Sequence, residues 1–169
     1  YNNQLSGSIP ESLGNLSHST FFSLSHNQLS GTIPDSLGNL DSLEDLFSLS
    51  NNQLSGTIPE SLGNLSHLQG FYLYNNELCG KIPSSLMNLR RVNKLWLYNN
   101  HLTASDPDLI AWLNTKALKW TTQTPCSTVE ISLVYGVHDD GLNDSQFFSI
   151  DKDFEVKPLG DIHFGHDIE

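Results

Sequence analysis

Basic residues are scarce in this chain, and no stretch of it is strongly apolar. Its 169 residues hold eight lysines and arginines against 19 aspartates and glutamates, which gives a formal net charge of −11. Without a basic stripe, neither nucleic acid nor an anionic membrane is an electrostatically favourable partner. No apolar run approaches the roughly 18 residues that a membrane-spanning helix needs. The composition therefore excludes a nucleic-acid-binding function and a membrane span within this sequence.

Signatures of catalysis and of metal binding are also missing. The only two cysteines, Cys79 and Cys126, do not form a Cys-x-x-Cys pair, so a zinc site has little support. No Ser-His-Asp or Cys-His arrangement has a supporting context, and no glycine-rich loop is suited to hold phosphate. The segments 139–144 and 161–167 carry oxygen and nitrogen ligands, but they match neither a calcium-binding loop nor a zinc-protease helix. We therefore predict no enzyme activity, no metal and no cofactor.

What the chain has in abundance is one repeated phrase. Asparagine recurs at intervals of 24, 25, 24 and 24 residues, at Asn3, Asn27, Asn52, Asn76 and Asn100. The phrase around it is LxxLxxLxLxxNxLxGxIPxxLGNL, clearest from Leu37 to Pro59 and from Leu62 to Pro83. Leucines at these offsets, with a period of about 20 to 29 residues, mark a leucine-rich repeat. One short coil cannot bury its apolar side alone, so consecutive coils are expected to stack around a shared core.

The complete phrase resembles the plant-type leucine-rich repeat. It stands as LSGSIPESLGNL at Leu5 to Leu16 and as LSGTIPDSLGNL at Leu29 to Leu40. This subtype occurs in plant receptor kinases, polygalacturonase inhibitors, a plant antifreeze protein and some secreted bacterial proteins. The resemblance implies an α/β fold: a right-handed solenoid with a parallel concave sheet and short 3₁₀ turns on its convex side. It also implies an extracellular or cell-surface location and the recognition of a protein, peptide or glycan, although fold and function are only loosely tied.

Three segments are predicted along the chain. Residues 1–104 form the solenoid of about five coils, 105–126 a capping helix and linker, and 127–169 an acidic, hairpin-like β tail. Strand-like alternation at 129–137, 146–150 and 154–157 makes the tail resemble the opening blade of a β-propeller-type domain of bacterial surface proteins. The sequence begins inside a repeat without a polar cap, so we predict a fragment of a longer secreted or surface protein. Neighbouring domains of the same chain are then among its partners.

Within one coil, the LxL segment is expected to be a short strand whose alternate side chains face inward. The inward pairs are Phe22/Leu24, Phe71/Leu73 and Leu95/Leu97. The five repeat asparagines are expected to bond to backbone groups of adjacent coils, and each Gly-x-Ile-Pro to form a second extended piece.

Two departures from the repeat are informative. Ser19 stands where other coils have Leu43, Leu68 and Val92, so its coil is expected to be weaker. The 25-residue interval gains a residue near 45–47, which predicts a bulge at the sheet edge.

The repeat ends after Leu102, and the next residues have the features of a helix start. In Ser105-Asp106-Pro107-Asp108 a capping residue is followed by proline in the first turn and by an acid near the positive end of the helix dipole. We predict a helix over 107–114 that closes the solenoid, with Trp112 and Trp120 covering the last coil.

The best candidate site is a group of aromatic residues on the outward positions of the sheet. One outward column runs Tyr1, Ser25, Ser50, Tyr74, Tyr98, and its neighbour runs Ser23, Ser48, Tyr72, Trp96. With strands about 4.8 Å apart, Tyr72, Tyr74, Trp96 and Tyr98 are expected to form one patch, flanked by Lys94 and Asn99. Exposed aromatics with polar tips suit the recognition of peptides or sugars. The alternative is side-chain stacking along the sheet without further function.

Two further sets of residues are candidates for covalent modification. Plant-type repeats usually end in cysteine-bearing caps, so the resemblance makes Cys79 and Cys126 a candidate disulfide, although such caps commonly carry cysteines close together. Asn15, Asn64 and Asn143 each stand in an Asn-x-Ser sequence, the acceptor pattern of N-glycosylation. For Asn15 and Asn64 the alternative is purely structural, because the asparagine belongs to the repeat phrase.

Two other functions are compatible with the repeat. The solenoid is suited to serve as a spacer for a neighbouring domain. Ice binding is the other alternative, because one plant antifreeze protein shares this repeat. Ice binding needs a flat, regular array of threonine, serine or asparagine side chains, and here the column Ser8, Thr32, Thr57 is interrupted by Lys81.

Overall fold

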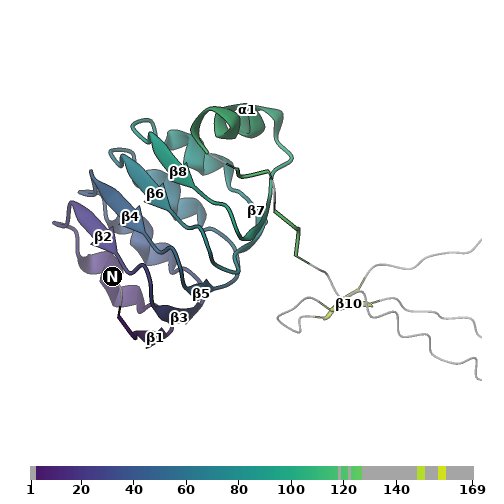
Figure 1. Cartoon of the computed structure of the whole chain (residues 1–169), viewed down its shortest axis with the longest axis horizontal. Coiled ribbons are helices and arrows are strands. Elements are labelled where there is room, and N and C mark those ends of the chain that lie inside the picture. Colours follow the sequence, from purple (N-terminus) through teal and green to yellow (C-terminus); the bar gives the residue numbers. More distant parts are fainter. Residues whose placement is uncertain (1–2, 118, 122, 127–147, 151–155, 159–169) are drawn as a thin grey trace, which may run out of the picture. The chain divides into compact units, whose positions relative to one another are not determined.

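The computed structural model describes residues 3–117, 119–121, 123–126, 148–150 and 156–158 (Figure 1). The chain divides into two units, Tyr1–Cys126 and Ser127–Glu169. In the second unit, β10 (Phe148–Ile150) pairs antiparallel with β11 (Val156–Pro158). The predicted strand at 129–137, the candidate ligand segments at 139–144 and 161–167, and Asn143 lie outside the described residues.

The first unit is a stack of coils whose central feature is a parallel sheet, called here the main sheet. Its strands run in the order β2 (Phe21–Ser23), β4 (Leu46–Ser48), β6 (Gly70–Tyr72) and β8 (Lys94–Trp96). Each strand pairs with the strand of the next coil, in the order in which they occur in the sequence (Figure 1). The predicted solenoid with its parallel sheet is therefore confirmed.

The coils also contain second short strands, each of the first four of which is followed by a 3₁₀ turn. The second strands are β1 (Ser6–Gly7), β3 (Gln28–Gly31), β5 (Gln53–Leu54), β7 (Cys79–Lys81) and β9 (His101–Thr103). The 3₁₀ turns are η1 (Glu11–Asn15), η2 (Asp35–Asn39), η3 (Glu60–Asn64) and η4 (Ser84–Asn88). A proline precedes every turn, with φ between −61° and −70° and ψ of 137° or 138°. The proline of Gly-x-Ile-Pro thus ends the extended piece and starts the turn.

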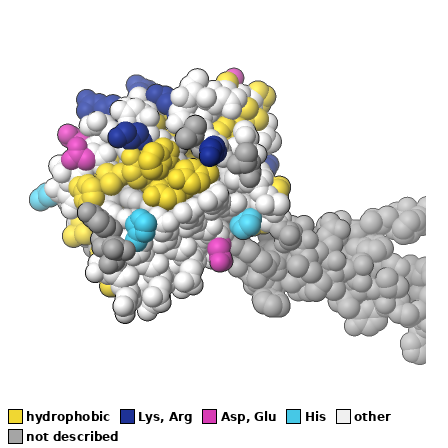
Figure 2. Space-filling view, in the orientation of Figure 1, with side chains coloured by type: hydrophobic (Ala, Val, Ile, Leu, Met, Phe, Trp, Pro, Cys, Tyr) yellow, Lys and Arg dark blue, Asp and Glu magenta, His cyan; other side chains and the backbone are white. Residues whose placement is uncertain are grey.

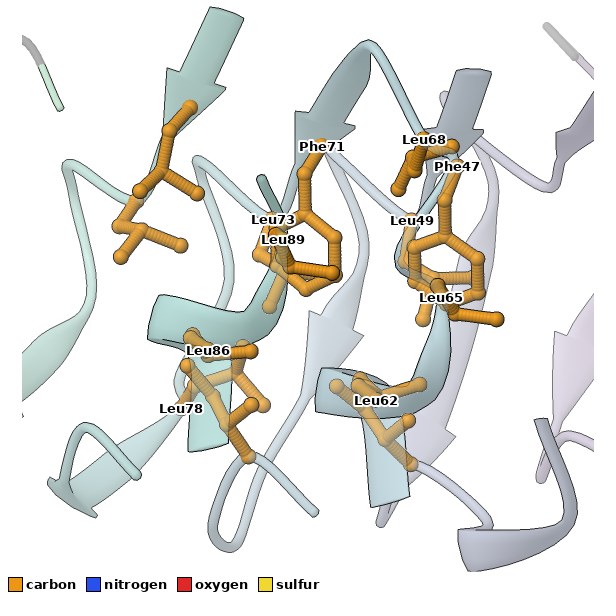
Figure 3. Close-up of a cluster of buried hydrophobic side chains, with 14 of the residues drawn as sticks. Phe47, Leu49, Leu62, Leu65, Leu68, Phe71, Leu73, Leu78, Leu86 and Leu89 are labelled. Atoms are coloured by element: carbon orange, nitrogen blue, oxygen red, sulfur yellow. The ribbon is translucent and has the colours of Figure 1, made fainter. Parts of the chain in front are cut away.

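Leucines and phenylalanines from all coils form one continuous core. Phe22, Phe47 and Phe71 stack along the solenoid with ring centroids 5.5 and 5.4 Å apart. Figure 3 shows Phe47 and Phe71 among the leucines of the same region, all fully buried. Of the predicted inward residues, Leu24 is only partly buried. The first coil buries less apolar surface than the others, because Ser19 replaces a core leucine and Leu16 stays half-exposed.

The repeat asparagines connect adjacent coils through their side-chain amides. Asn76 is buried, accepts a hydrogen bond from the Leu54 N–H of the preceding coil (3.1 Å) and donates to the carbonyls of Leu49 and Leu73 (both 3.0 Å). Asn27, Asn52 and Asn100 make equivalent bonds to the N–H groups of Leu5, Leu29 and Leu78. For Asn3, the backbone N–H donates to the carbonyl of His26 (3.2 Å). Each coil therefore satisfies backbone groups that its neighbour leaves open.

The 3₁₀ turns η1, η2 and η3 stack so closely on the next turn that a side chain is excluded at one position in each of them. A Cβ atom added to Gly14, Gly38 or Gly63 would overlap the backbone of a serine in the next turn. These serines, Ser36, Ser61 and Ser85, donate through Oγ to carbonyls of the preceding turn at 2.7 to 2.8 Å. In η4 the equivalent residue is Met87, which packs partly buried against the core. A side chain is allowed there because helix α1, rather than another 3₁₀ turn, follows.

The additional residue of the 25-residue interval lies just before β4. The backbone N–H groups of Glu44 and Asp45 both donate to the carbonyl of Thr20, at 3.2 and 3.1 Å. The Gln69 carbonyl accepts in the same way from the N–H groups of Asn93 and Lys94, at 3.0 and 3.3 Å, in an interval without an additional residue, so this sharing does not mark a bulge. The additional residue also does not lie at the sheet edge, as predicted, because β4 is an inner strand of the main sheet. Pairing from Leu46 onward is regular.

Helix α1 (Pro107–Lys116) ends two residues later than predicted. It begins as expected, with the Asp106 side chain accepting from the Asp108 N–H at 2.9 Å. The helix continues to Lys116, whose Nζ donates to the Val92 carbonyl (3.1 Å) in the last leucine-rich coil. This tertiary contact leaves no local signal in the sequence. Trp120 is buried, with its Nε1 donating to Asn114 Oδ1 (3.0 Å), and Trp112 is partly buried.

The residues after α1 make the same kinds of contact as a further coil, although they lack the repeat sequence. Ala117 forms a parallel bridge to Leu95, which extends the main sheet. The Gln123 side chain accepts from the Leu102 N–H (3.2 Å) and donates to the Trp120 carbonyl (2.8 Å), as the repeat asparagines do in their own coils. Three residues later, Cys126 is paired with Cys79 of β7 in a disulfide, with the two Cα atoms 5.9 Å apart. The cap is thus tied to the solenoid by hydrogen bonds and by one covalent bond.

Candidate functional site

The structure brings Tyr72, Tyr74, Trp96 and Tyr98 together on the outer face of the main sheet; we call this group the aromatic cluster. Tyr72 stacks on Trp96 with ring centroids 4.5 Å apart, and Tyr74 stacks on Tyr98 at 4.9 Å. The two stacked pairs contact each other, the Tyr74 and Trp96 rings meeting edge to face at 5.6 Å. Four rings thus form a two-by-two array. Tyr1, at the start of the same column, lies outside the described residues.

Strand alternation and register put these rings on one face. Tyr72 pairs with Trp96 across β6 and β8, while the intervening Leu73 and Leu97 point inward and are fully buried. Backbone hydrogen bonds continue past the strands, with Asn75 N–H donating to the Tyr98 carbonyl at 3.1 Å. The rings therefore stand on a fixed backbone, which is the condition for a preorganised binding surface.

Gly70 contributes to the cluster through its missing side chain. A Cβ atom at this position would lie 3.1 Å from Leu46 Cδ1 and 3.5 Å from Tyr72 Cζ. The Leu46 side chain and the Tyr72 ring therefore occupy the space beside Gly70. This role was not predicted, because in the sequence Gly70 resembles an ordinary variable position of the repeat.

The same face is different in the two preceding coils. There Ser23 and Ser25 bond to each other through their hydroxyls (3.0 Å), as do Ser48 and Ser50 (3.1 Å). Ser48 and Ser50 are only 3% and 2% exposed. Small, mutually bonded serines thus stand at the positions that the large rings occupy in β6 and β8.

A second row of asparagines borders the cluster. His26, Asn51, Asn75 and Asn99 all have φ between 54° and 56°, and their side chains are linked along the solenoid. Asn99 donates to Asn75 (2.6 Å), Asn75 donates to Asn51 (2.7 Å), and Asn51 Nδ2 lies 3.2 Å from His26 Nε2. Asn99, predicted as a flanking residue, is the exposed end of this row. The row itself was missed, although its signal was present: asparagine stands directly before four of the five repeat asparagines, and asparagine tolerates the left-handed conformation.

Positive charge lies near the cluster. Lys94, the first residue of β8, is exposed and precedes Trp96 by two positions. Figure 2 shows a band of hydrophobic side chains across this face, with lysine and arginine side chains along one rim. Arg90 and Arg91, in the loop before β8, line a small surface hollow with His67. The face therefore combines aromatic surface with a cationic edge in a chain that is acidic overall.

Burial raises the pKa of Tyr72 and of Tyr98 above the ordinary 10.0, and the neighbouring Tyr74 adds to both shifts. The phenols of Tyr72 and Tyr98 are therefore neutral hydroxyls near pH 7. They offer hydrogen-bond donors and acceptors rather than charge.

A larger groove of about 680 Å³ lies away from the aromatic cluster. Thr32, Thr57 and Lys81 are among its lining residues, together with Asp35, Glu60 and Asp106. Lys81 thus interrupts the column of hydroxyl side chains considered for ice binding. The residue that pairs with Lys81 in the next strand, β9, is Thr103.

Among the described residues no group of three histidine, cysteine, aspartate or glutamate side chains is placed to hold a metal ion. Within the same part of the chain, no helix has the length and apolarity to cross a membrane.

Comparison with known proteins gives the same architecture. The Leucine Rich Repeat family model matches residues 1–16, 19–40, 45–65 and 67–89. No curated protein matches the chain. A solved structure of the leucine-rich-repeat ectodomain of the plant membrane receptor kinase GASSHO1/SCHENGEN3 from Arabidopsis thaliana, in complex with CASPARIAN STRIP INTEGRITY FACTOR 2, is 44% identical over 70% of this chain, with a TM-score of 0.61.

Two further structures come from complexes of Arabidopsis proteins. The receptor kinase HAESA, in complex with the peptide hormone IDA and the co-receptor SERK1, is 36% identical over 85% of this chain, with a TM-score of 0.60. A chain of the BIR3–SERK2 complex from Arabidopsis thaliana is 32% identical over 75% of this chain and 70% of its own, with a TM-score of 0.58. The present chain spans only 14% of the GASSHO1/SCHENGEN3 chain and 22% of the HAESA chain.

Proposed function

Because the chain belongs to the plant-type leucine-rich-repeat family, we propose that it is a non-enzymatic recognition module that binds a peptide or protein across its aromatic cluster. The observation that carries this proposal is the two-by-two array of Tyr72, Tyr74, Trp96 and Tyr98 on a rigid sheet. Tyrosine and tryptophan dominate the binding energy of protein interfaces, because they offer large contact area with little conformational entropy to lose. The similar ectodomains seen in complex with a peptide hormone or a co-receptor support the same class of partner.

The chemistry around the cluster defines which peptide fits best. Lys94 offers an ammonium group on the strand that carries Trp96. Asn99 offers amide hydrogen-bonding groups at the end of the polar row. A segment with an apolar or aromatic side chain next to a carboxylate would use the rings and the cation together. A glycan is the other partner class compatible with these rings, since sugars also stack on aromatic side chains.

The proposed location is extracellular or at the cell surface. The similar plant structures are ectodomains of membrane receptor kinases, and a disulfide such as Cys79–Cys126 persists in an oxidising compartment. Besides this disulfide, hydrogen bonds and buried apolar side chains stabilise the solenoid. Neither the fold nor the proposed recognition therefore requires a cofactor.

The test is a selection of binders with the complete chain. A library of random linear peptides is displayed and selected against the wild-type chain, and enriched peptides are titrated against four single variants: Tyr72→Ala, Tyr74→Ala, Trp96→Ala and Tyr98→Ala. Each substitution is expected to weaken binding by about 2 kcal/mol or more, roughly thirtyfold, as for central aromatic residues of interfaces. Binding is also expected to change the fluorescence of Trp96, which the Trp96→Phe variant identifies.

Matched substitutions away from the cluster are the controls. Thr32→Ala and Thr57→Ala change side chains that line the distant groove, and they are expected to leave the affinity unchanged. Peptides that bind wild type and the four cluster variants equally would place recognition elsewhere. Binding to an arrayed set of plant glycans, with no peptide enriched, would show that the partner class is wrong.

A further inference from the structure

The 3₁₀ turns present four asparagines in equivalent places. Asn15, Asn39, Asn64 and Asn88 are each the last residue of η1, η2, η3 and η4, and each is exposed. In all four turns the following leucine donates its backbone N–H to the leucine three residues before it. The four turns therefore end with the same backbone hydrogen bond, while the second residue after each asparagine differs.

Within the described part of the chain, the side chains of Asn15 and Asn64 make no hydrogen bond that stabilises the fold. The repeat asparagines are held by hydrogen bonds to neighbouring coils, and the row ending at Asn99 is held by bonds between amides. Neither Asn15 nor Asn64 makes a side-chain hydrogen bond to any described residue. The stacking of the turns thus depends on the glycines and serines rather than on these asparagines.

Only two of the four turns complete an acceptor sequence. Asn15-Leu16-Ser17 and Asn64-Leu65-Ser66 place serine two residues after asparagine, whereas the other two turns have Asp41 and Arg90 there. In the third turn the Ser66 N–H donates to the Asn64 carbonyl (2.7 Å), and in the fourth the Arg90 N–H donates to the Asn88 carbonyl (2.8 Å). A serine is thus accommodated at this position without a change of backbone.

We infer that Asn15 and Asn64 are N-glycosylation sites, placed on alternate coils and on the turns rather than on the main sheet. In the reaction, the asparagine Nδ2 forms a bond to the anomeric carbon of an oligosaccharide carried on a lipid diphosphate. The bond from that carbon to the diphosphate oxygen breaks, the lipid diphosphate leaves, and the amide gives up one proton. This inference rests on the proposed extracellular location, because the reaction requires passage through a secretory compartment.

The test uses the complete chain, secreted from eukaryotic cells behind a heterologous signal sequence and carrying Asn143→Gln. Intact mass and gel mobility before and after enzymatic removal of N-glycans are expected to show two oligosaccharides. Ser17→Ala and Ser66→Ala, which keep both asparagines, are each expected to remove one oligosaccharide, and together to remove both. Asp41→Ser completes an acceptor sequence at Asn39 and is expected to add a third.

The controls separate this inference from the proposed function. An unmodified chain, secreted beside a glycoprotein that is modified in the same cells, would overturn it whatever the peptide selection shows. A shift that survives Ser17→Ala combined with Ser66→Ala would also overturn it. Peptide affinity is measured on the same samples, so a failure of partner binding is recognised independently of the mass.

Discussion

Single asparagine residues have three different roles in this protein, and the surroundings of each side chain decide which role applies. Asn76 and its equivalents are enclosed between coils and bond to backbone groups. Asn75 and its equivalents adopt positive φ and bond to one another. Asn64 stands at a turn end with an unbonded amide among the described residues. Substitution by alanine is therefore expected to have very different consequences at neighbouring positions.

Asn76→Ala is expected to destabilise the solenoid by about 1–3 kcal/mol. The carbonyls of Leu49 and Leu73 keep a second donor, from Asn52 and Asn100, so only the buried Leu54 N–H loses its partner. One unsatisfied buried donor costs about 1–3 kcal/mol. Equilibrium denaturation by urea measures the change, with Asn64→Ala as the exposed control. Equal losses for the two variants would contradict the proposed role.

Tyr72 is expected to titrate later than an exposed tyrosine. Its pKa in the folded chain is raised above 10.0, first by burial and then by Tyr74, so folding favours the protonated phenol. The stabilisation from Tyr72 is present below pH 10, the unfolded-state pKa, and is lost as the pH rises through the raised folded-state pKa. The ultraviolet absorbance of the phenolate, followed from pH 8 upward, is expected to have a smaller late component in Tyr72→Phe, the remainder belonging to Tyr98. An unchanged late component would assign it to Tyr98 alone.

At the scale of elements, the sequence predicts more of the regular coils than of the cap. The strands, the 3₁₀ turns, the asparagine bonds and the facing of Tyr72 toward Trp96 follow from a pattern that every coil repeats. The end of α1 at Lys116, the contribution of Gln123 and the space beside Gly70 do not. Each of these depends on a contact that occurs once, between residues far apart in the sequence. A periodic sequence pattern predicts only the contacts that recur in every coil.

The cap is expected to depend on Gln123 and on the disulfide to different degrees. Cys126→Ser opens a loop of 47 residues and is expected to lower stability by about 4 kcal/mol on the chain-entropy estimate. Gln123→Ala leaves the Leu102 N–H without its acceptor and is expected to cost about 1–2 kcal/mol. Thermal unfolding with and without a thiol reductant measures both effects. The reductant is expected to lower the melting temperature of the wild type but not that of Cys126→Ser; insensitivity of the wild type would show that the disulfide contributes nothing.

For the molecule as a whole, the described core belongs to one unit. The buried hydrophobic cluster runs from Ile9 to Trp120, and both cysteines of the disulfide lie within Tyr1–Cys126. Within this unit the main sheet carries the aromatic cluster, while the turns carry Asn15 and Asn64. Partner binding and sugar attachment are thus assigned to different surfaces.

A chain shortened to residues 1–126 is therefore expected to fold by itself. The contacts among the described residues that hold the core and the cap are retained in it, so its melting temperature should match that of the corresponding transition in the complete chain. Circular dichroism and calorimetry on the two chains make the comparison. A shortened chain without cooperative unfolding would show that the second unit contributes to the solenoid's stability.

The fourth turn has Met87 where the other three turns have glycine, and this limits where new coils can be added during evolution. A turn that carries a methionine at this position cannot accept another 3₁₀ turn against it, whereas Gly14, Gly38 and Gly63 each can. Duplication of an internal coil preserves every glycine contact and the cap together. Duplication of the fourth coil would place Met87 against the serine of its own copy. New coils are therefore expected to arise within the array, and the coil next to the cap to remain a single copy as the array lengthens.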